Sequence, residues 1–362
     1  MYDVAIIGAG INGTAVAFEL TQAGKRVALF DKGGIAAGGS GAAGAFISPK
    51  FSKSGALKEI LHHSFLYSMA FYEKHFPQHF LKSPLLHIAK DEKDDATLLH
   101  YKAETPLELL PFKDETRESV SINAGIVNAK QMCEALASEA HLHQEEIRTL
   151  KRENGVWILN ENYRAEHIVI ATGAYEQLLQ EPYIKLRGVW GHRVDLKTTT
   201  NNPLSLHQEV SISPSNDGVV AVGATHDVHY HPQKTTTPYD YEAGREILLS
   251  RASRTISLED VVIIKDYVGL RSGSFDYMPM VGSLVNAKET LLDNSINFYT
   301  KKPDFSAYSY YKNLTMINGS GGYGFVLAPY LAKILSAYIL EEKEISSKLL
   351  PARFFARYAK RV

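Results

Sequence analysis

The feature that most constrains the fold is the spacing of three glycines near the N-terminus. Gly8, Gly10 and Gly13 stand in GxGxxG spacing directly after an apolar segment at residues 2–7. That segment suits a fully buried parallel strand. Residues 14–23 then predict a helix. A strand, a glycine turn and a helix in this order are typical of the first half of a βαβ unit.

Each glycine of such a turn has a mechanical role. Gly8 allows the tight turn, Gly10 lets a pyrophosphate approach the backbone, and Gly13 lets the helix pack closely on the sheet. The helix start at Ile11 and Asn12 offers free N–H groups and about half a positive charge to phosphates. The pattern therefore predicts a dinucleotide site.

Two further segments extend this prediction. A second strand at residues 26–30 ends at Asp31, 18 residues after Gly13 (31 minus 13), where a carboxylate can accept hydrogen bonds from an adenosine ribose. A second glycine-rich turn, residues 319–324, precedes a helix whose N-terminus would stabilise negative charge on a reduced flavin. Alone, that turn is better explained as a flexible loop before a packing helix. The first unit by itself does not separate FAD from NAD.

Composition narrows the function classes. The 362 residues suffice for two domains. With 39 basic and 40 acidic residues, the chain has no global attraction to polyanions. The basic residues near the C-terminus, Arg353, Arg357, Lys360 and Arg361, form the clearest local patch for tRNA phosphates, although a solvated helix face is the simpler interpretation. A single cysteine, Cys133, excludes an internal disulfide and a CxxC metal site.

No segment of about 18 uninterrupted apolar residues occurs, since Pro329 and Lys333 interrupt the best candidate. We expect a cytoplasmic protein without membrane contact, and no metal, although His226, Asp227, His229 and His231 cluster. An antiparallel sheet is expected over residues 186–264, inserted between parts of the nucleotide domain. The other predicted elements are helices over 57–76, 127–140 and 325–341, a hairpin of 147–150 and 156–159 around Asn154-Gly155, strands over 167–170 and 314–317, and a loop over 266–282.

These motifs resemble the D-amino-acid-oxidase-like (DAO) family of FAD oxidoreductases, which includes glycine oxidases and D-amino acid dehydrogenases. Besides the glycine turns, the resemblance rests on Gly39-Ser40-Gly41, Ala171-Thr172-Gly173, Gly269-Leu270-Arg271 and Met278-Pro279-Met280-Val281-Gly282. Segments 38–52, 269–282 and 318–329 are most similar to the flavin domain of bifunctional tRNA 5-methylaminomethyl-2-thiouridine biosynthesis proteins. Departures are Ala42, where that family usually has Asn, Val189, where it often has Gln, and the absence of the methyltransferase half.

The resemblance implies an α/β fold: a Rossmann-like, glutathione-reductase-like FAD-binding domain with an inserted antiparallel-sheet substrate domain. The implied FAD-binding parts are residues 1–80, 126–185 and 266–362, and the substrate parts are 81–125 and 186–265. The residues expected to bind FAD are Gly8, Gly10, Ile11, Asn12, Gly13, Asp31, Lys32, Ser40, Gly41, Ile147, Thr172, Gly173, Arg271, Gly321, Gly322, Tyr323 and Gly324.

The family chemistry oxidises a C–N bond, with the cofactor carrying the reaction and the protein orienting the substrate. The resemblance implies that Arg271 grips a substrate carboxylate through paired hydrogen bonds; a surface pair with Asp276 is the alternative. Tyr323 is the second candidate, and His192 and Tyr267 are weaker ones. Tyr308, Tyr310 and Tyr311 would stack bases or, more simply, pack in the core.

Three functions remain open at this point. The first is removal of the carboxymethyl group from a carboxymethylaminomethyl-uridine at the tRNA wobble position, implied by the closer resemblance. The second is oxidation of glycine, a small N-alkyl glycine or a D-amino acid. The third is a flavin-bearing protein that binds or assembles without turnover.

Overall fold

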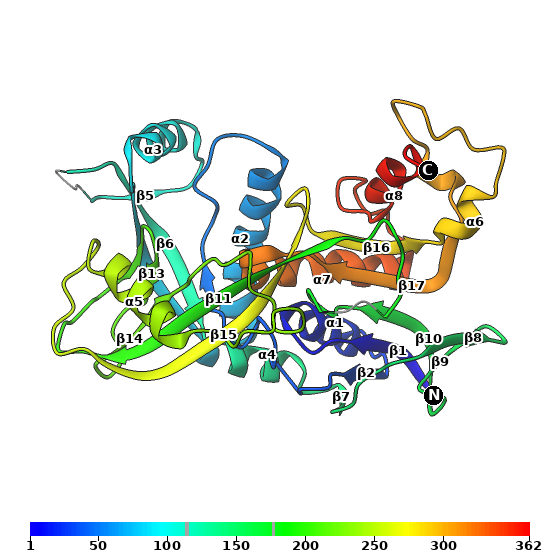
Figure 1. Ribbon diagram of the computed structural model, residues 1–362, viewed down its shortest axis with the longest axis horizontal. Helices are drawn as coiled ribbons and strands as arrows, with labels where there is room; N and C mark the ends of the chain where they lie inside the picture. Colours follow the sequence, from blue (N-terminus) through cyan, green and yellow to red (C-terminus); the bar gives the residue numbers. More distant parts are fainter. Residues whose placement is uncertain (113–115, 176–177) are drawn as a thin grey trace.

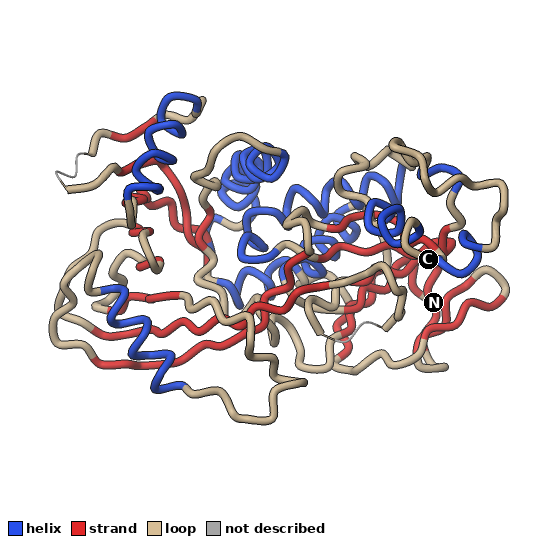
Figure 2. Tube along the Cα trace, turned by 45° about the horizontal axis from the view of Figure 1, so that its top comes forward, coloured by secondary structure: helices blue, strands red, loops and turns tan. Residues whose placement is uncertain are grey.

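The computed structural model describes residues 1–112, 116–175 and 178–362, which form two β-sheets with helices packed around them (Figure 1). Both termini lie at the end of the molecule that holds sheet A (Figure 2). The strands of sheet A are β1 (Tyr2–Ile7), β2 (Val27–Phe30), β7 (His141–His143), β8 (Leu150–Glu153), β9 (Val156–Leu159), β10 (Tyr163–Ile170), β16 (Met280–Val285) and β17 (Tyr310–Asn318). Their order is β16-β17-β10-β1-β2-β7, with the β8–β9 hairpin attached to β10.

Sheet B lies beside sheet A and contains β3 (Phe46–Ile47), β4 (Phe80–Ile88), β5 (Leu109–Leu110), β6 (Ser119–Val127), β11 (Leu186–Lys197), β12 (Ser205–His207), β13 (Ser211–Ile212), β14 (Val219–Gly223) and β15 (Val262–Ser274). Its order is β15-β11-β14-β13-β12-β4-β6-β3, with β5 on β6. The long strands β11 and β15 run antiparallel across much of the molecule (Figure 1).

The helices are α1 (Ile11–Gln22), α2 (Ala56–His75), α3 (Glu92–Glu104), α4 (Ala129–Leu136), α5 (Tyr241–Ala252), α6 (Ala287–Leu291), α7 (Gly324–Glu341) and α8 (Ala352–Ala359). Short 3₁₀ turns occupy Pro77–His79, Phe305–Ala307 and Gly321–Tyr323. By length and composition, the segment Gly321–Glu341 could cross a membrane, but half of it is buried inside the protein. It packs in the main core against α1 and α2, so we describe it as a core helix.

Sheet A has the parallel, doubly covered arrangement that the N-terminal pattern predicts. β1 pairs in parallel with β2 and β10, and β10 with β17. Val4 and Ile6 pack in the core that contains α1 and α7, whereas Ala5 and Ile7 enter a second core with Phe355 of α8. Because both faces are covered, β1 is apolar at successive positions rather than alternating. The predicted Rossmann-like α/β class is confirmed.

Sheet B differs from the expected antiparallel sheet in one respect. β4 and β6 join it from the earlier part of the chain, and β4 pairs with β12 in parallel. The sheet is therefore mixed. Its apolar face is formed by alternate residues of β11, β12, β13 and β14, which pack with Leu248 of α5: Val194, Leu196, Leu206, Ile212, Val220 and Val222.

The predicted loop over residues 266–282 is wrong. Most of it is strand, because β15 continues to Ser274 and β16 begins at Met280. Gly269 and Gly273 both lie within β15. In a strand interior, glycine often marks a close backbone approach, and a Cβ on Gly269 would lie 2.9 Å from the Gly39 Cα.

The other predicted elements are present with shifted bounds. The helix expected over 127–140 is the shorter α4, whose N-cap Asn128 accepts a hydrogen bond from the Gln131 N–H. The helices expected over 14–23, 57–76 and 325–341 are α1, α2 and α7, and the hairpin around Asn154-Gly155 is β8–β9. The predicted strands over 167–170 and 314–317 are parts of β10 and β17.

Helix α7 contains a proline, and α2 compensates for it. Pro329 has no N–H and so cannot donate to the Phe325 carbonyl one turn earlier. The hydroxyl of Tyr72 on α2 donates to that carbonyl instead, at 2.8 Å, and Ser68 donates to the Val326 carbonyl at 2.7 Å. These buried bonds hold the first turn of α7 against α2.

We therefore predict that Tyr72→Phe lowers the free energy of unfolding by about 1–3 kcal/mol, the cost of an unsatisfied buried carbonyl. Pro329→Ala supplies a backbone N–H at that position, so the loss from Tyr72→Phe should shrink in the Pro329→Ala background. Urea unfolding of the four proteins of this cycle measures the coupling. Tyr67→Phe on the same helix is the matched control, and equal losses from Tyr72→Phe in both backgrounds would refute the explanation.

Candidate functional site

A cavity of about 1020 Å³ lies between the two sheets. It is lined by the first glycine turn and the N-terminus of α1, by the loop over residues 37–51, by the turn before α7 and by one face of sheet B. Its volume is at the upper end of the range for ligand pockets. Two helix N-termini, those of α1 and α7, therefore meet one cavity.

The glycine turn has the close packing that dinucleotide sites require. Gly8 has a φ of 110°, and a Cβ there would lie 2.3 Å from the Ala171 carbonyl oxygen. A Cβ on Gly13 would lie 1.9 Å from the Gly8 carbonyl oxygen. Only glycine fits these positions, so α1 sits directly against β1 and its N-terminus faces the cavity.

Polar side chains fix the loops around this turn. Asp31, at the end of β2, accepts hydrogen bonds from the N–H groups of Ala9 and Gly33, both at 2.9 Å. Ser40 accepts from the Ile11 N–H at 2.9 Å. The Asp31 carboxylate thus clamps the turn and has lone pairs left for a ligand hydroxyl.

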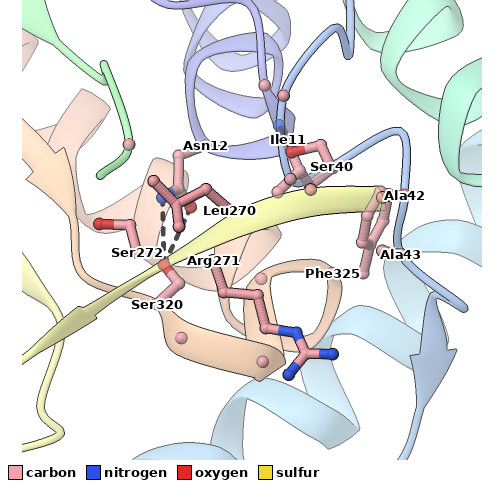
Figure 3. A pocket seen from close by; sticks show the side chains of 18 of the residues that line it. Ile11, Asn12, Ser40, Ala42, Ala43, Leu270, Arg271, Ser272, Ser320 and Phe325 are labelled. Carbon is pink, nitrogen blue, oxygen red and sulfur yellow. Dashed lines mark hydrogen bonds between the residues drawn. The ribbon is translucent and has the colours of Figure 1, made fainter. Parts of the chain in front are cut away.

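The N-termini of α1 and α7 are joined directly. Asn12 and Ser320 exchange two hydrogen bonds of 3.1 Å each, drawn as dashed lines in Figure 3. Neither helix has an acidic residue in its first turn. Both helix dipoles therefore direct uncompensated positive charge toward the cavity.

The structure gathers nearly all of the residues predicted to bind a dinucleotide cofactor. Those that line the cavity are Gly8, Gly10, Ile11, Asn12, Asp31, Lys32, Ser40, Ile147, Thr172, Gly173, Arg271, Gly321, Gly322, Tyr323 and Gly324. Gly13 and Gly41 do not line it. Both lie behind the wall, where a Cβ on Gly41 would be 2.2 Å from the Ala36 carbonyl oxygen.

Sheet B contributes the floor of the cavity. Facing residues form one continuous row across five strands through the pairs Arg193–Gly223, Gly223–Ser211, Ser211–His207 and His207–His87. All five residues line the cavity. They lie on the face opposite the apolar core of sheet B, because side chains alternate along each strand. Small residues in mid-row leave the space that a ligand would fill.

Arg271 projects from β15 among the cavity-lining residues (Figure 3). Its guanidinium lies over Gly191 of β11, where a Cβ would be 2.5 Å from Nη2, and Nη2 donates to the Thr225 carbonyl at 3.1 Å. Burial lowers the pKa of the Arg271 guanidinium, but arginine remains charged at physiological pH. Arg271 therefore presents a fixed cation to the cavity.

The alternative pairing of Arg271 with Asp276 is wrong. Asp276 binds Arg353 instead, through hydrogen bonds of 2.9 and 3.0 Å from Nε and Nη2. Arg353 is nearly buried, Arg357 also lies near Asp276, and Lys360 donates to the Thr300 carbonyl. Part of the basic C-terminal patch is thus occupied by internal contacts.

Several weaker candidates lie outside the cavity wall. His192 faces α5 and pairs with Asp266 at 2.8 Å, and burial lowers its pKa. Tyr267 lies beneath the Arg193 guanidinium, 3.9 Å from ring centroid to Cζ. Tyr308 packs in the core, while Tyr310 and Tyr311 donate to Phe305 and Glu181. Within the described ranges, no group of three or more His, Cys, Asp or Glu residues is arranged to hold a metal ion.

Residues 3–338 match the family model described as DAO, FAD dependent oxidoreductase. The chain belongs to the DAO family of FAD-dependent oxidoreductases. This confirms the resemblance drawn from the glycine turns and the Gly269–Gly282 segment, and with it the assignment of the chain as an oxidoreductase.

Relatives of this DAO-family chain include bifunctional proteins of tRNA modification. The tRNA 5-methylaminomethyl-2-thiouridine biosynthesis bifunctional protein MnmC of Campylobacter concisus is 25% identical over 375 residues, covering 98% of this chain and 60% of the relative. The Legionella pneumophila protein of the same name is 24% identical, covering 97% and 57%. The chain therefore spans about 60% of the length of these relatives.

Solved structures share the DAO fold. Glycine oxidase from Bacillus cereus superposes with a TM-score of 0.73 at 22% identity, over 95% of this chain and 96% of that one. L-proline dehydrogenase from P. horikoshii superposes with a TM-score of 0.72 at 16% identity, over 98% and 97%. At these identities the likeness establishes the architecture.

Sequence reasoning did not identify Lys50, His87, Arg193, His207 or Ser211, all of which line the cavity of this DAO-family chain. Lys50 lies 5.5 Å from the centroid of the Tyr323 ring, and burial lowers its pKa. For the four strand residues, the available signal was a polar residue next to apolar ones in a short predicted strand. That signal does not distinguish a cavity face from a solvent face.

We predict that Asp31→Ala raises the dissociation constant for FAD by about tenfold or more, because the variant loses a charged acceptor and its clamp on the turn. Quenching of FAD fluorescence on titration with apoprotein measures this constant. Asp3→Ala is the matched control, since Asp3 accepts from the Arg26 N–H and does not line the cavity. Wild-type FAD affinity in Asp31→Ala would contradict the assigned role.

Proposed function

We propose that this chain binds FAD in the cavity and oxidises the C–N bond of an N-substituted glycine, namely the carboxymethylaminomethyl group of a tRNA wobble uridine. The observation that carries the proposal is the half-buried guanidinium of Arg271, which is held against Gly191 and the Thr225 carbonyl on the cavity floor. In this proposal sheet A serves the cofactor, sheet B serves the substrate, and the protein works in the cytoplasm.

The residues present fit FAD. A Cβ would fill the packed turn at Gly8 and Gly13, and two helix N-termini without acidic residues suit a pyrophosphate and an electron-rich ring. Asp31 and Ser40 would hold the ribose and phosphate end. Bound FAD would supply a two-electron acceptor: loss of a hydride from the methylene carbon to FAD and of the N–H proton to solvent would form a C=N bond, and water would hydrolyse that bond to glyoxylate and the aminomethyl amine.

Arg271 would orient the substrate for that chemistry. A carboxylate that accepts two parallel hydrogen bonds from one guanidinium cannot rotate freely, so the adjacent methylene carbon is held in one place. The backbone bond to Thr225 and the contact with Gly191 fix the guanidinium in advance. Little orientation therefore has to be gained on binding.

The choice of tRNA rests on the Campylobacter and Legionella relatives, which are bifunctional proteins of tRNA 5-methylaminomethyl-2-thiouridine biosynthesis and match nearly the whole of this chain. Their aligned part is about 60% of their length, so the substrate remains part of the proposal. An N-substituted glycine carries the carboxylate that Arg271 is placed to hold.

The test is anaerobic bleaching of the oxidised-flavin absorbance band, with carboxymethylaminomethyl-uridine tRNA, glycine, sarcosine and D-alanine in separate cuvettes. We expect bleaching by the tRNA. Arg271→Ala should lower the ratio of the reduction rate constant to the dissociation constant at least 100-fold, the effect of losing about 3 kcal/mol of paired charged hydrogen bonds. Arg271→Lys should recover only part of this ratio, because an ammonium group cannot donate two parallel hydrogen bonds to one carboxylate.

Arg152→Ala is the control for loss of a positive charge, because Arg152 is exposed on the β8–β9 hairpin, away from the cavity lining. It should bleach at the wild-type rate. Rapid bleaching by a free amino acid with the tRNA inert would sink the tRNA role and leave a small-amine oxidase or dehydrogenase. No bleaching by any amine would sink the catalytic proposal.

A further inference from the structure

Two imidazoles at the end of the row that crosses sheet B, and two phenyl rings beside them, form one part of the cavity wall. His87 of β4 and His207 of β12 are paired across a parallel ladder, with ring centroids 6.3 Å apart. Phe51 stacks on His87 at 4.7 Å, and Phe46 meets the edge of His207 at 5.0 Å. All four residues line the cavity. This set of four is called the histidine wall below.

Each imidazole of the histidine wall has hydrogen-bonding capacity to spare. His87 Nδ1 and His207 Nε2 are buried, and neither finds a partner within the described part of the chain. The opposite nitrogens, His87 Nε2 and His207 Nδ1, also make no hydrogen bond there but are not buried, so they are the ones that a ligand in the cavity can reach, and polar atoms covered by a ligand need partners. Burial lowers the pKa of His87 to about 4 and that of His207 to about 3. Both rings are therefore neutral near pH 7, each with one donor and one acceptor.

The cavity floor thus has two ends of unlike charge. Arg193 and Arg271 place cations at one end, whereas the histidine wall is neutral, polar and aromatic. Three strand steps, from β11 through β14 and β13 to β12, separate Arg193 from His207, which is about 14 Å at the usual strand spacing. Gly223 and Ser211 lie between Arg193 and His207 in the row, and their small side chains leave space for a ligand there.

We propose that the histidine wall is a subsite for the planar, neutral ring of the substrate, a uracil-type nucleobase whose carboxylate-bearing substituent extends toward Arg271. The ring stacks against the wall, and its N–H and carbonyl groups exchange hydrogen bonds with His87 Nε2 and His207 Nδ1. This inference rests on the proposed function, since it names the part of the substrate that the Arg271 end does not hold. Glycine or sarcosine would leave both imidazoles unsatisfied.

The neutrality of the wall suits a base better than a phosphate. An anion would gain little from two uncharged imidazoles and would lose its hydration on burial. A flat ring with donors and acceptors satisfies both nitrogen atoms and the aromatic faces together. The charge of the floor therefore orients the substrate, with its carboxylate at the arginines and its base at the histidines.

The test uses a ligand that binds without reacting: the thioether analogue of 5-carboxymethylaminomethyl-uridine, in which sulfur replaces the oxidisable nitrogen. Acetate is the ring-free probe. Calorimetric titration of the FAD-loaded protein should show about tenfold weaker binding of the analogue in His87→Leu and in His207→Leu. Acetate affinity should stay at the wild-type value, because Arg271 is intact.

Conservative variants separate the hydrogen bond from mere shape. His87→Gln keeps a polar atom near the Nε2 position and His207→Asn keeps one near Nδ1, so both should retain most of the affinity for the analogue. His167→Leu is the matched control, because His167 is a buried histidine of sheet A, bonded to Thr315 and absent from the cavity wall. It should not change the ratio of analogue to acetate affinity.

The outcomes distinguish this inference from the proposed function. Wild-type affinity for the analogue in both leucine variants, or a parallel loss of acetate binding, overturns the subsite even if modified tRNA bleaches the flavin. Selective loss of analogue binding upholds the subsite. If the amine-bearing nucleoside and tRNA then fail to bleach the wild-type flavin, the subsite stands and the proposed reaction falls.

Discussion

The contact between Gly13 and the Gly8 carbonyl is the constraint on which the site depends. Because no side chain separates them, α1 sits against β1 and its N-terminus is fixed at the edge of the parallel sheet. Asp31 then reaches the Ala9 N–H, and the Asn12–Ser320 pair fixes the start of α7 relative to α1. The bond from Tyr72 to the Phe325 carbonyl anchors the same turn from α2. The close contact between Gly13 and Gly8 thus positions the N-terminus of α1 directly, and hydrogen bonds from α1 and α2 then position the N-terminus of α7.

Sheet B reaches the same cavity by a different principle. Side chains alternate between the two faces of each strand. One face packs in a core, and the other lines the cavity instead of facing solvent. Val194 and Val222 pack below α5, while their neighbours Arg193 and Gly223 face the ligand space. The pairing register of the strands therefore decides which cationic and which histidine side chains face the cavity. Shifting one strand by a single residue would exchange the faces.

This difference explains which parts of the site could be predicted from the sequence. The turn at Gly8, Gly10 and Gly13 is local, since its glycines, helix and acid lie within about thirty residues. The position of Arg271 followed from a family resemblance, but its partner Gly191 did not, because the pairing of β11 and β15 joins distant segments. His87 and His207 are 120 positions apart (207 minus 87), and only the parallel pairing of β4 and β12 brings them together. The prediction of a loop over residues 266–282 was wrong for the same reason, because β15 pairs with the distant strand β11.

The charge distribution bears on how a chain of balanced charge could select a tRNA. Part of the C-terminal basic patch is consumed inside the fold, where Arg353 neutralises Asp276, so that patch is a weaker candidate for phosphate binding than the sequence suggested. The surface potential of this patch therefore contributes less to the selection of tRNA than the four basic residues alone would suggest. The charges that remain distinctive lie inside the cavity, at Arg193 and Arg271, and the neutral imidazoles complement them. In this arrangement, discrimination between a free amino acid and a modified nucleotide depends on whether the accessible imidazole nitrogens, His87 Nε2 and His207 Nδ1, find partners, because polar atoms left unpaired in the closed site penalise the smaller ligand.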